Sequence, residues 1–359
     1  MANQKRKSRV MKVLVSALEP SSNLHLKELL KYSSNIELCG IFSKDLGHPL
    51  YDVSDMAIMG FVDALKKYRW FKSILDDMVE LSKDVDRVLL MDSSGFNIPL
   101  AKKIKKRYPN IEIIYYILPQ VWASRAYRVK KIEKYCDKIF ATLPFEVELY
   151  SKAKYVGHPL LDEIYLQKTK VSNSGIVSFM PGSRRGEIKH LFPIYRELVK
   201  VLPNLKEAIL IVPSSFSLEQ IEELYGDTSL FIISRDTHKS LYKSDFAFIC
   251  SGTATLEASL IGTPFVLSYI AKKIDYFIAK NIFKIKEIGL ANIILRHYNN
   301  TTLHNELIQS DVTVDNLLNE YKSINREKFL DRTQILKEYL NRGSSKFVGE
   351  YISNLNYIL

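Results

Sequence analysis

The most informative stretch of the chain is Ile176-Val177-Ser178-Phe179-Met180-Pro181-Gly182-Ser183-Arg184-Arg185-Gly186-Glu187. A short apolar run ends at a Pro-Gly turn, and a helical pattern begins at Glu187, so the order is strand, turn and helix. Gly182 and Ser183 let the backbone approach an anion, which the first N–H groups and the dipole of the helix attract. Either arginine of the pair can add a bidentate contact to phosphate. The stretch predicts either a site for a nucleotide diphosphate or a basic turn that only caps a helix.

A second junction of this type is Cys250-Ser251-Gly252-Thr253-Ala254-Thr255-Leu256-Glu257, which directly follows another apolar run. Ser251, Gly252 and Thr253 offer N–H groups and hydroxyls to a phosphate. Glu257 lies one helical turn further on, where a carboxylate can accept both hydroxyls of a ribose. The alternative is a hydroxyl N-cap with a capping-box glutamate, which needs no ligand. Two such junctions close together in the chain favour one nucleotide diphosphate held by both.

Short apolar runs alternate with helical patterns along most of the chain, which predicts parallel sheets covered by helices on both faces. The expected class is α/β, with two doubly wound Rossmann-like domains facing a cleft and with helices at the C-terminus. Ligands of such folds bind beyond the carboxyl ends of the strands. The expected divisions are a disordered tail at 1–10, a first domain at 11–165, a second at 166–335, and helices at 336–359 that cross back to the first domain or to a partner subunit.

Composition limits the class of protein. The chain has 359 residues, 47% of them hydrophobic and 25% charged, which suits two globular domains. Cys39, Cys136 and Cys250 are widely spaced, which argues against a disulfide framework or a zinc site and fits a reducing cytosol. The net charge of +11 suits a nucleotide, a phosphorylated lipid or an anionic membrane surface. The basic residues are scattered and form no nucleic-acid-binding signature, so no nucleic acid is expected. No apolar run is long enough to predict a membrane-spanning helix.

Two carboxylates are candidates for a catalytic base. Asp92 follows a predicted strand, where it either deprotonates an acceptor hydroxyl or caps the next helix. Glu19 follows the first strand and has the same two interpretations. His158 is expected to be structural. The run Asp84-Val85-Asp86 has a metal–diphosphate pattern, but it precedes its strand, at the wrong end of the sheet, so no metal site is expected.

Aromatic, apolar and basic residues are mixed between positions 59 and 78. This composition predicts either an interfacial helix that contacts anionic lipid and acyl chains or an amphipathic helix docked on the sheet. Trp122, in a loop beside two arginines, is expected to be an exposed type of aromatic residue on the rim of the cleft. The candidate acceptor or membrane residues are Phe61, Leu65, Trp70, Phe71 and Trp122.

Taken together, these segments resemble the lipid-A-disaccharide synthase family of inverting glycosyltransferases, which have the two-Rossmann-domain GT-B fold. The resemblance extends from about Met11 to the last helix. It rests on Asp92 with Phe96-Asn97, Pro119-Gln120-Val121-Trp122-Ala123, Leu143-Pro144-Phe145-Glu146, Val156-Gly157-His158-Pro159, Pro181-Gly182-Ser183-Arg184, Ser251 to Glu257, and Asn292 with Glu306-Leu307-Ile308-Gln309.

The resemblance implies the reaction. UDP-2,3-diacylglucosamine donates its sugar to the 6-hydroxyl of 2,3-diacylglucosamine 1-phosphate, which gives a β-1,6-linked disaccharide 1-phosphate and UDP without a cofactor. It also implies a homodimer with exchanged C-terminal segments, and a cytoplasmic protein peripheral to the inner membrane. The first domain would take the acceptor and the second the UDP-sugar. The alternative is another GT-B enzyme, such as a UDP-sugar 2-epimerase or a different membrane glycosyltransferase.

The resemblance also implies roles for individual residues. Arg184 matches the arginine that the family directs at the donor diphosphate. Gly95 stands where the family often has an aspartate that is a candidate base, which leaves Asp92 in this segment, with Glu19 as the second candidate. The implied donor-binding residues are Gly182, Ser183, Arg184, Ser251, Gly252, Thr253, Glu257, Asn292 and Gln309.

Overall fold

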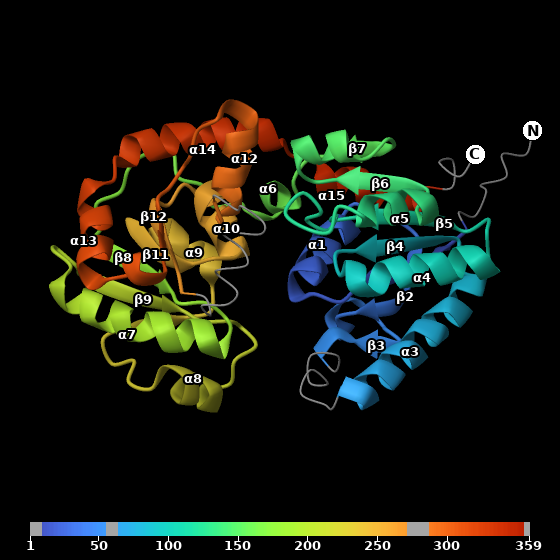
Figure 1. Cartoon of the computed structure of the whole chain (residues 1–359), viewed down its shortest axis with the longest axis horizontal. Coiled ribbons are helices and arrows are strands. Elements are labelled where there is room, and N and C mark those ends of the chain that lie inside the picture. The colour runs from blue at the N-terminus through green and yellow to red at the C-terminus, as the bar shows by residue number, and fades with distance from the viewer. Residues whose placement is uncertain (1–8, 55–63, 271–286, 355–359) are drawn as a thin grey trace, which may run out of the picture. The chain divides into compact units, whose positions relative to one another are not determined.

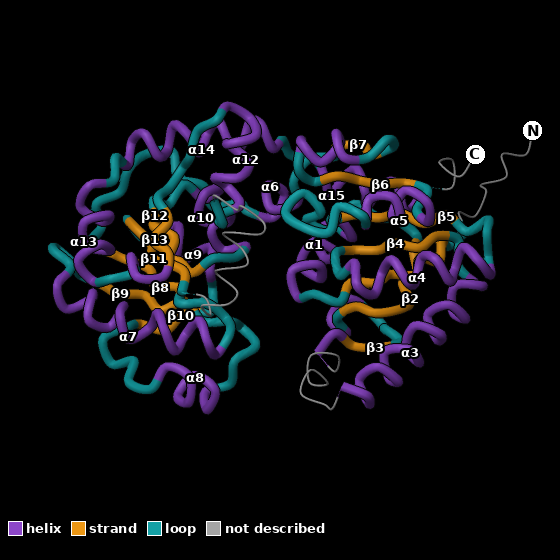
Figure 2. Tube along the Cα trace, viewed as in Figure 1, coloured by secondary structure: helices purple, strands orange, loops and turns teal. Residues whose placement is uncertain are grey.

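The computed structural model describes residues 9–54, 64–270 and 287–354, and it divides into two compact units. The first unit comprises Met1–Glu163 with Leu340–Leu359, and the second comprises Ile164–Tyr339. Each unit is a parallel sheet between layers of helices, as Figure 1 shows by element and Figure 2 by secondary structure. The predicted α/β class with two doubly wound sheets is therefore confirmed.

The first unit holds a seven-stranded parallel sheet in the order β3-β2-β1-β4-β5-β6-β7. Its strands are short and almost wholly apolar because helices cover both faces. They are β1 Met11–Ala17, β2 Ile36–Phe42, β3 Tyr51–Asp52, β4 Arg87–Met91, β5 Glu112–Tyr116, β6 Lys138–Ala141 and β7 Ala153–Tyr155. The helices are α1 Pro20–Leu30, α3 Ala64–Leu81, α4 Ser94–Arg107, α5 Arg128–Tyr135, α6 Pro159–Glu163 and α15 Ser344–Ser353, with 3-10 turns at Lys44–Leu46, Ser82–Asp84 and Pro144–Leu149.

Alternate residues of the central strands feed two cores on opposite faces of this sheet. Leu90 packs with residues of α3, α4 and α5 on one face. Leu89 packs with residues of α1 and α15 on the other. The first unit is thus completed by a helix from the far end of the chain.

A buried polar cluster attaches that helix, α15. The side chain of Arg87 is fully buried, and its Nε lies 2.7 Å from Oε2 of Glu112. The Tyr351 hydroxyl donates to Oε1 of Glu112 at 2.7 Å, and Arg87 donates to the carbonyl oxygen of Tyr351. At the start of α15 the carboxylate of Asp162 accepts from the N–H groups of Gly343 and Ser345, both at 2.8 Å.

The second unit holds a six-stranded parallel sheet in the order β10-β9-β8-β11-β12-β13. Aromatic rings fill one of its faces: Phe179 of β8 stacks on Phe248 of β11 with the ring centroids 5.3 Å apart. The strands are β8 Ile176–Met180, β9 Glu207–Ile211, β10 Ile232–Ser234, β11 Phe246–Cys250, β12 Phe265–Tyr269 and β13 Glu306–Ile308. The helices are α7 Arg185–Val201, α8 Leu218–Tyr225, α9 Thr237–Lys243, α10 Thr253–Ile261, α12 Leu290–Asn299, α13 Val314–Ser323 and α14 Arg326–Leu340, and Gln309–Asp311 form a 3-10 turn.

Candidate active site

The tertiary structure brings the two phosphate-type junctions together. Strands β8 and β11 are parallel neighbours, and Met180 at the end of β8 pairs in register with Ile249. The turn 181–184 and the turn at Ser251 therefore leave the same edge of the sheet, where the order of the strands reverses and ligands of such folds bind. Burial raises the pKa of the Cys250 thiol to about 12, and the charges of Glu187 and Arg184 in the neighbouring turn also act on it.

Glu187 organises the first of these turns. Its Oε2 accepts hydrogen bonds from the backbone N–H groups of Ser183 and Arg184, both at 3.1 Å. Gly182 has φ +106°, and a Cβ at this position would lie 2.4 Å from Oε2 of Glu187. A carboxylate of the chain therefore takes the N–H groups of Ser183 and Arg184, and the role of Ser183 in donor binding stays a prediction. The spacing between Arg184 and Glu187 is that of a capping box, the sequence signal that could have shown this.

The arginine pair is divided between two partners. Arg184 Nη1 donates to Oε1 of Glu187 at 2.6 Å, which raises the pKa of Arg184 and keeps it charged. Arg185 pairs instead with Glu223 of α8, and both of these side chains are exposed. Only Arg184 is thus linked to the turn that faces β11.

The second junction, from β11 to α10, has no cap from a described side chain at the start of its helix. Gly252, with φ +147°, is the N-cap of α10 and makes no capping hydrogen bond, and Thr255 Oγ1 donates to its carbonyl oxygen at 2.7 Å. No described side chain accepts from the N–H groups of Thr253 and Ala254, which point along the positive end of the helix dipole. Four other helices that begin in the described part of the second unit have a side-chain cap: α8 by Ser217, α9 by Asp236, α13 by Thr313 and α14 by Asn325. At the starts of α7 and α12 a carboxylate instead accepts from the N–H of the N-cap residue, Glu187 from Arg184 and Glu306 from Gly289.

Glu257 lies one turn into α10, half-buried, and its Oε2 lies 3.8 Å from Nε2 of His238. Gln309 lies directly after β13 in a left-handed conformation, with φ +58°. Both residues are near the carboxyl edge of the second sheet, but β12 separates the strand before Gln309 from β11.

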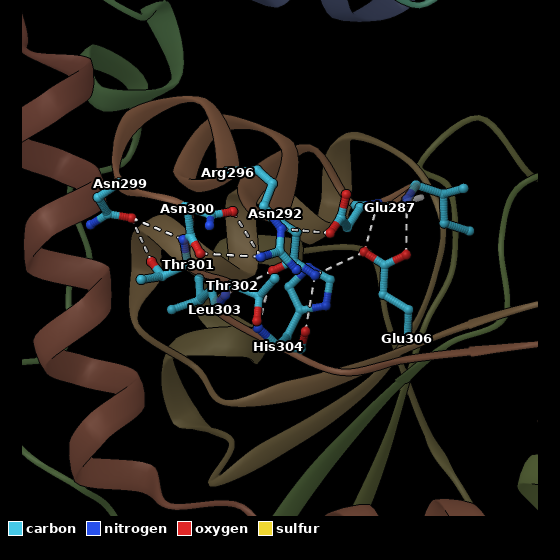
Figure 3. A network of polar contacts seen from close by, with 12 residues as sticks. Glu287, Asn292, Arg296, Asn299, Asn300, Thr301, Thr302, Leu303, His304 and Glu306 are labelled. Atoms are coloured by element: carbon cyan, nitrogen blue, oxygen red, sulfur yellow. Dashed lines mark hydrogen bonds and ion pairs between the residues drawn. The ribbon is translucent and has the colours of Figure 1, made fainter. Parts of the chain in front are cut away.

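The side chain of Asn292 is enclosed in a network of hydrogen bonds (Figure 3). Its amide nitrogen donates to the carbonyl oxygen of His304 at 2.9 Å and to Oε1 of Glu306 at 2.8 Å. Its amide oxygen accepts from the N–H groups of Leu303 at 2.8 Å and His304 at 3.2 Å. These four bonds use the full hydrogen-bonding capacity of the amide, so Asn292 supports its neighbours here, and its role in binding the UDP-sugar stays a prediction.

The same network fixes the start of α12. Glu306 accepts from the N–H groups of Ile288 at 2.8 Å and Gly289 at 3.1 Å (Figure 3). The imidazole of His304 packs on Phe265 with the ring centroids 4.3 Å apart, and burial lowers its pKa to about 4, so it is neutral. The resemblance singles out Asn292 and Glu306, but the sequence does not show that they meet at His304, because the members of the cluster lie on separate elements.

In the first unit, Asp92 lies in a tightly held turn after β4. Asp92 and Ser93 both have positive φ, at +51° and +32°, which is uncommon for residues with a side chain. The amide nitrogen of Asn97 donates to the carbonyl oxygens of Met91 and Asp92, both at 2.9 Å. The hydroxyl of Tyr115 donates to the carbonyl oxygen of Asp92 at 2.5 Å. A strained pair of residues that neighbours hold in place is typical of a functional site.

The two carboxylates predicted as bases share one neighbourhood. Burial raises the pKa of Asp92, the N–H of Ser93 lowers it by donating to Oδ1 at 2.8 Å, and the charge of Glu19 raises it further. The Ser93 hydroxyl donates to Oε1 of Glu19 at 3.1 Å. The charge of His25 lowers the pKa of Asp92, and Nδ1 of His25 lies 2.5 Å from Oε1 of Glu163. The pair of His25 and Glu163 was not predicted from the sequence.

His158 and the Asp84–Asp86 run have structural contacts. Burial lowers the pKa of His158 to about 3, and its Nδ1 accepts from the N–H of Leu160. Asp86 precedes β4 and accepts from the N–H of Lys12 at 2.9 Å. Among the described residues, no group of three or more His, Cys, Asp or Glu side chains is arranged to hold a metal ion.

The candidate acceptor or membrane residues divide into two groups. Phe61 lies outside the described residues, and Leu65 lies in α3, where its side chain is not described. Trp70 and Phe71 are half-buried against the core of the first unit, and Phe71 packs on Phe96 with the ring centroids 5.1 Å apart. The described part of α3 therefore docks on the sheet. In the portion of the chain that the structure describes, no helix combines the length and apolar character needed to cross a bilayer.

Trp122 differs from its predicted exposure. Its ring is half-buried against Phe145, with the centroids 5.7 Å apart at 81°, because the loop folds onto the 3-10 turn at Pro144–Leu149. The indole N–H is enclosed and makes no hydrogen bond of normal geometry, yet it lies close enough to Glu146 to lower the pKa of that carboxyl. Burial outweighs this effect and raises the pKa of Glu146 to about 8.

Comparison with known proteins decides the family. A family model described as lipid-A-disaccharide synthetase matches residues 13–348. The chain belongs to this family. It is 48% identical over 356 residues to a lipid-A-disaccharide synthase of Helicobacter pylori, a match that covers 96% of this chain and 98% of that protein. It is 45% identical over 364 residues to the synthase of Campylobacter jejuni, covering 95% and 99%. The chain is thus a glycosyltransferase of lipid A biosynthesis.

Solved structures share the fold at low sequence identity. A UDP-GlcNAc 2-epimerase from Neisseria meningitidis matches with a TM-score of 0.60 at 13% identity, covering 96% of this chain and 99% of that one. The calicheamicin glycosyltransferase CalG4 matches with a TM-score of 0.56 at 10% identity, covering 96% and 98%. These likenesses confirm the GT-B type of fold and carry no information on substrate. The epimerase alternative is not favoured, because the relatives at 45–48% identity are synthases.

Proposed function

We propose that the chain is a metal-independent, inverting transferase that moves 2,3-diacylglucosamine from UDP to the 6-hydroxyl of 2,3-diacylglucosamine 1-phosphate. The proposal rests on family membership and on one observation of the structure. The uncapped N-terminus of α10 lies beside the turn that carries Arg184, at the reversal of strand order in the second sheet. That arrangement supplies two sources of positive charge to one diphosphate.

The donor binds in the second unit. Gly252 lets the diphosphate approach the backbone, Ser251 and Thr253 add hydroxyls, and no described side chain takes the first N–H groups of α10. Arg184 adds a charged fork to the phosphate oxygens. Glu257, one turn further along α10, accepts the ribose hydroxyls. Gly182 and Ser183 act indirectly, by shaping the turn that holds Arg184. Asn292 also acts indirectly, by fixing the start of α12. Gln309 contributes to donor binding from the end of β13.

The acceptor hydroxyl is deprotonated in the first unit. Its oxygen attacks the anomeric carbon as its proton passes to the Asp92 carboxylate, and the bond from that carbon to the β-phosphate oxygen breaks with its electron pair leaving on UDP. One in-line displacement inverts the anomeric centre. The raised pKa of Asp92, to which the charge of Glu19 contributes, makes it a stronger base than an ordinary carboxylate. Arg184 and the α10 dipole stabilise the charge that develops on UDP, so the mechanism requires no metal.

The enzyme binds a membrane surface and forms a homodimer. The net charge of +11 favours peripheral binding to the anionic cytoplasmic face of the inner membrane, and Phe61 and Leu65 are apolar residues of the sequence that suit acyl chains. In a homodimer that exchanges C-terminal segments, Arg87 of one chain would contact Tyr351 of the other chain. Exposed basic residues of α4 and α5 that suit an anionic surface are Lys102, Lys106, Lys130, Lys131 and Lys134.

The test is a direct assay with UDP-2,3-diacylglucosamine and radiolabelled 2,3-diacylglucosamine 1-phosphate, run with and without EDTA. Equal formation of disaccharide in both supports the reaction and its metal independence. Loss of product with EDTA would refute metal independence alone. Binding of UDP without product would mean that the acceptor is wrong, and diamino-sugar analogues of both substrates would be tested next.

A further inference from the structure

The two carboxylate oxygens of Glu187 have separate partners. Oε2 accepts from the backbone N–H groups of Ser183 and Arg184, both at 3.1 Å, and thereby holds the turn. Among the described residues, Oε1 accepts from the guanidinium of Arg184 alone, at 2.6 Å. The carboxylate is nearly buried, with 9% of the side chain exposed, whereas 78% of the Arg184 side chain is exposed. A nearly buried carboxylate thus holds the guanidinium of a largely exposed arginine.

A carboxylate at this position is unexpected on electrostatic grounds. Like charges repel, so a negative group beside a diphosphate opposes binding of that diphosphate. The chain nevertheless accommodates Glu187 closely, since only a glycine at position 182 leaves room for its Oε2. Its contribution must therefore be to geometry.

We propose that Glu187 is a positioning residue for the donor, with one oxygen shaping the turn and the other aiming Arg184 at the departing diphosphate. The inference deepens the proposed function and rests on it. An exposed arginine has many rotamers, and restricting them before the reaction lowers the entropic cost of stabilising the leaving group. The neighbouring Arg185 shows the contrast, because its partner Glu223 is itself 58% exposed and holds it only at the surface.

The variant Glu187→Gln separates the two tasks. Its amide oxygen can still accept from the N–H groups of Ser183 and Arg184, whereas its NH2 group cannot accept from the guanidinium. We expect an unchanged Tm and undiminished affinity for UDP in calorimetry, because a negative charge has been removed. We expect kcat to fall about 10-fold or more through lost orientation. Glu223→Gln is the matched control, since it removes the partner of Arg185, and it should leave kcat and UDP affinity unchanged.

A double-mutant cycle decides whether Glu187 acts through Arg184. In an Arg184→Ala background the guanidinium is absent, so Glu187→Gln should cause no further loss of kcat. An equal fall of kcat in both backgrounds would mean a general structural effect and would overturn the proposal, as would a Glu187→Gln enzyme with wild-type kcat. Glu187→Ala, which also releases the turn, should weaken UDP binding and lower the Tm.

The wild-type protein is measured first, because its results test the proposed function separately from the positioning role of Glu187. Wild-type protein that binds no UDP or forms no disaccharide would refute the proposed function, and the role of Glu187 with it. Wild-type protein that does both, combined with no coupling between Glu187 and Arg184, would refute only the positioning role.

Discussion

Asn97 supports Asp92 directly: its amide nitrogen donates to the carbonyl oxygen of Asp92 at 2.9 Å. The same amide accepts from the Ser16 hydroxyl at 2.6 Å, which ties the turn to β1. The two consecutive residues with positive φ, each of which costs on the order of 1–3 kcal/mol, are held by this contact and by Tyr115. Sequence patterns do not show that the catalytic candidate depends on these two neighbours.

Replacing Asn97 should therefore damage the turn and activity together. We expect Asn97→Ala to lower the free energy of unfolding by about 2–3 kcal/mol, because buried partners lose their hydrogen bonds, and to reduce kcat. Chemical denaturation and the transferase assay measure the two effects. Asn299→Ala, an exposed amide of α12, is the control. Wild-type kcat in Asn97→Ala would show that the turn is not needed for catalysis.

The pH dependence of kcat/KM should follow the surroundings of Asp92. Because burial raises the pKa of Asp92, activity should be lost on acidification at a higher pH than an ordinary aspartate with a pKa of about 3.9 would give. Glu19→Gln removes a charge that raises this pKa, so the acid limb should move to lower pH. His25→Gln removes a charge that lowers it, so the limb should move to higher pH. Limbs that coincide in all three enzymes would exclude Asp92 as the base.

Arg184→Ala should weaken UDP binding by about 10- to 100-fold, the usual loss for a charge-assisted hydrogen bond, and should lower turnover. The fold should remain intact, since the side chain is largely exposed. Titration calorimetry with UDP measures the affinity, and thermal unfolding checks the fold. Arg185→Ala is the matched control and should bind UDP as the wild type does. Unchanged affinity in Arg184→Ala would contradict the donor site.

The buried pair of Arg87 and Glu112 should be essential for attachment of α15. Arg87→Met leaves a buried carboxylate without its cation, and we expect a loss of about 3 kcal/mol or more in the free energy of unfolding. Hydrogen exchange should show earlier opening of α15. Lys103→Met, which breaks an exposed pair with Asp76, should change stability by less than about 1 kcal/mol. Similar losses of unfolding free energy in Arg87→Met and Lys103→Met would mean that burial does not strengthen the pair of Arg87 and Glu112.

Stability should fall with acidification partly through His304. Its pKa is lowered from 6.5 to about 4 by burial, so the folded protein binds this proton less readily than the unfolded chain. The contribution is fully present above pH 6.5 and is lost as the pH falls towards 4, to a total of about 3 kcal/mol. Urea unfolding at several pH values measures it. In His304→Gln the slope between these values should be smaller, and an identical slope would assign the effect to other groups.

The class of fold, the βα order and the family can be predicted from the residues alone, because apolar periodicity and the junctions at 176–187 and 250–257 are local patterns. Which groups at those junctions are open to a ligand depends on how the chain folds around them. Glu187 accepts from the N–H groups of the turn before α7, whereas no described side chain caps the start of α10. Asn292 uses its amide to bind His304 and Glu306, and Trp122 packs on Phe145. The physical reason is saturation: a polar group is free only when no other part of the folded chain reaches it, and those partners come from separate elements.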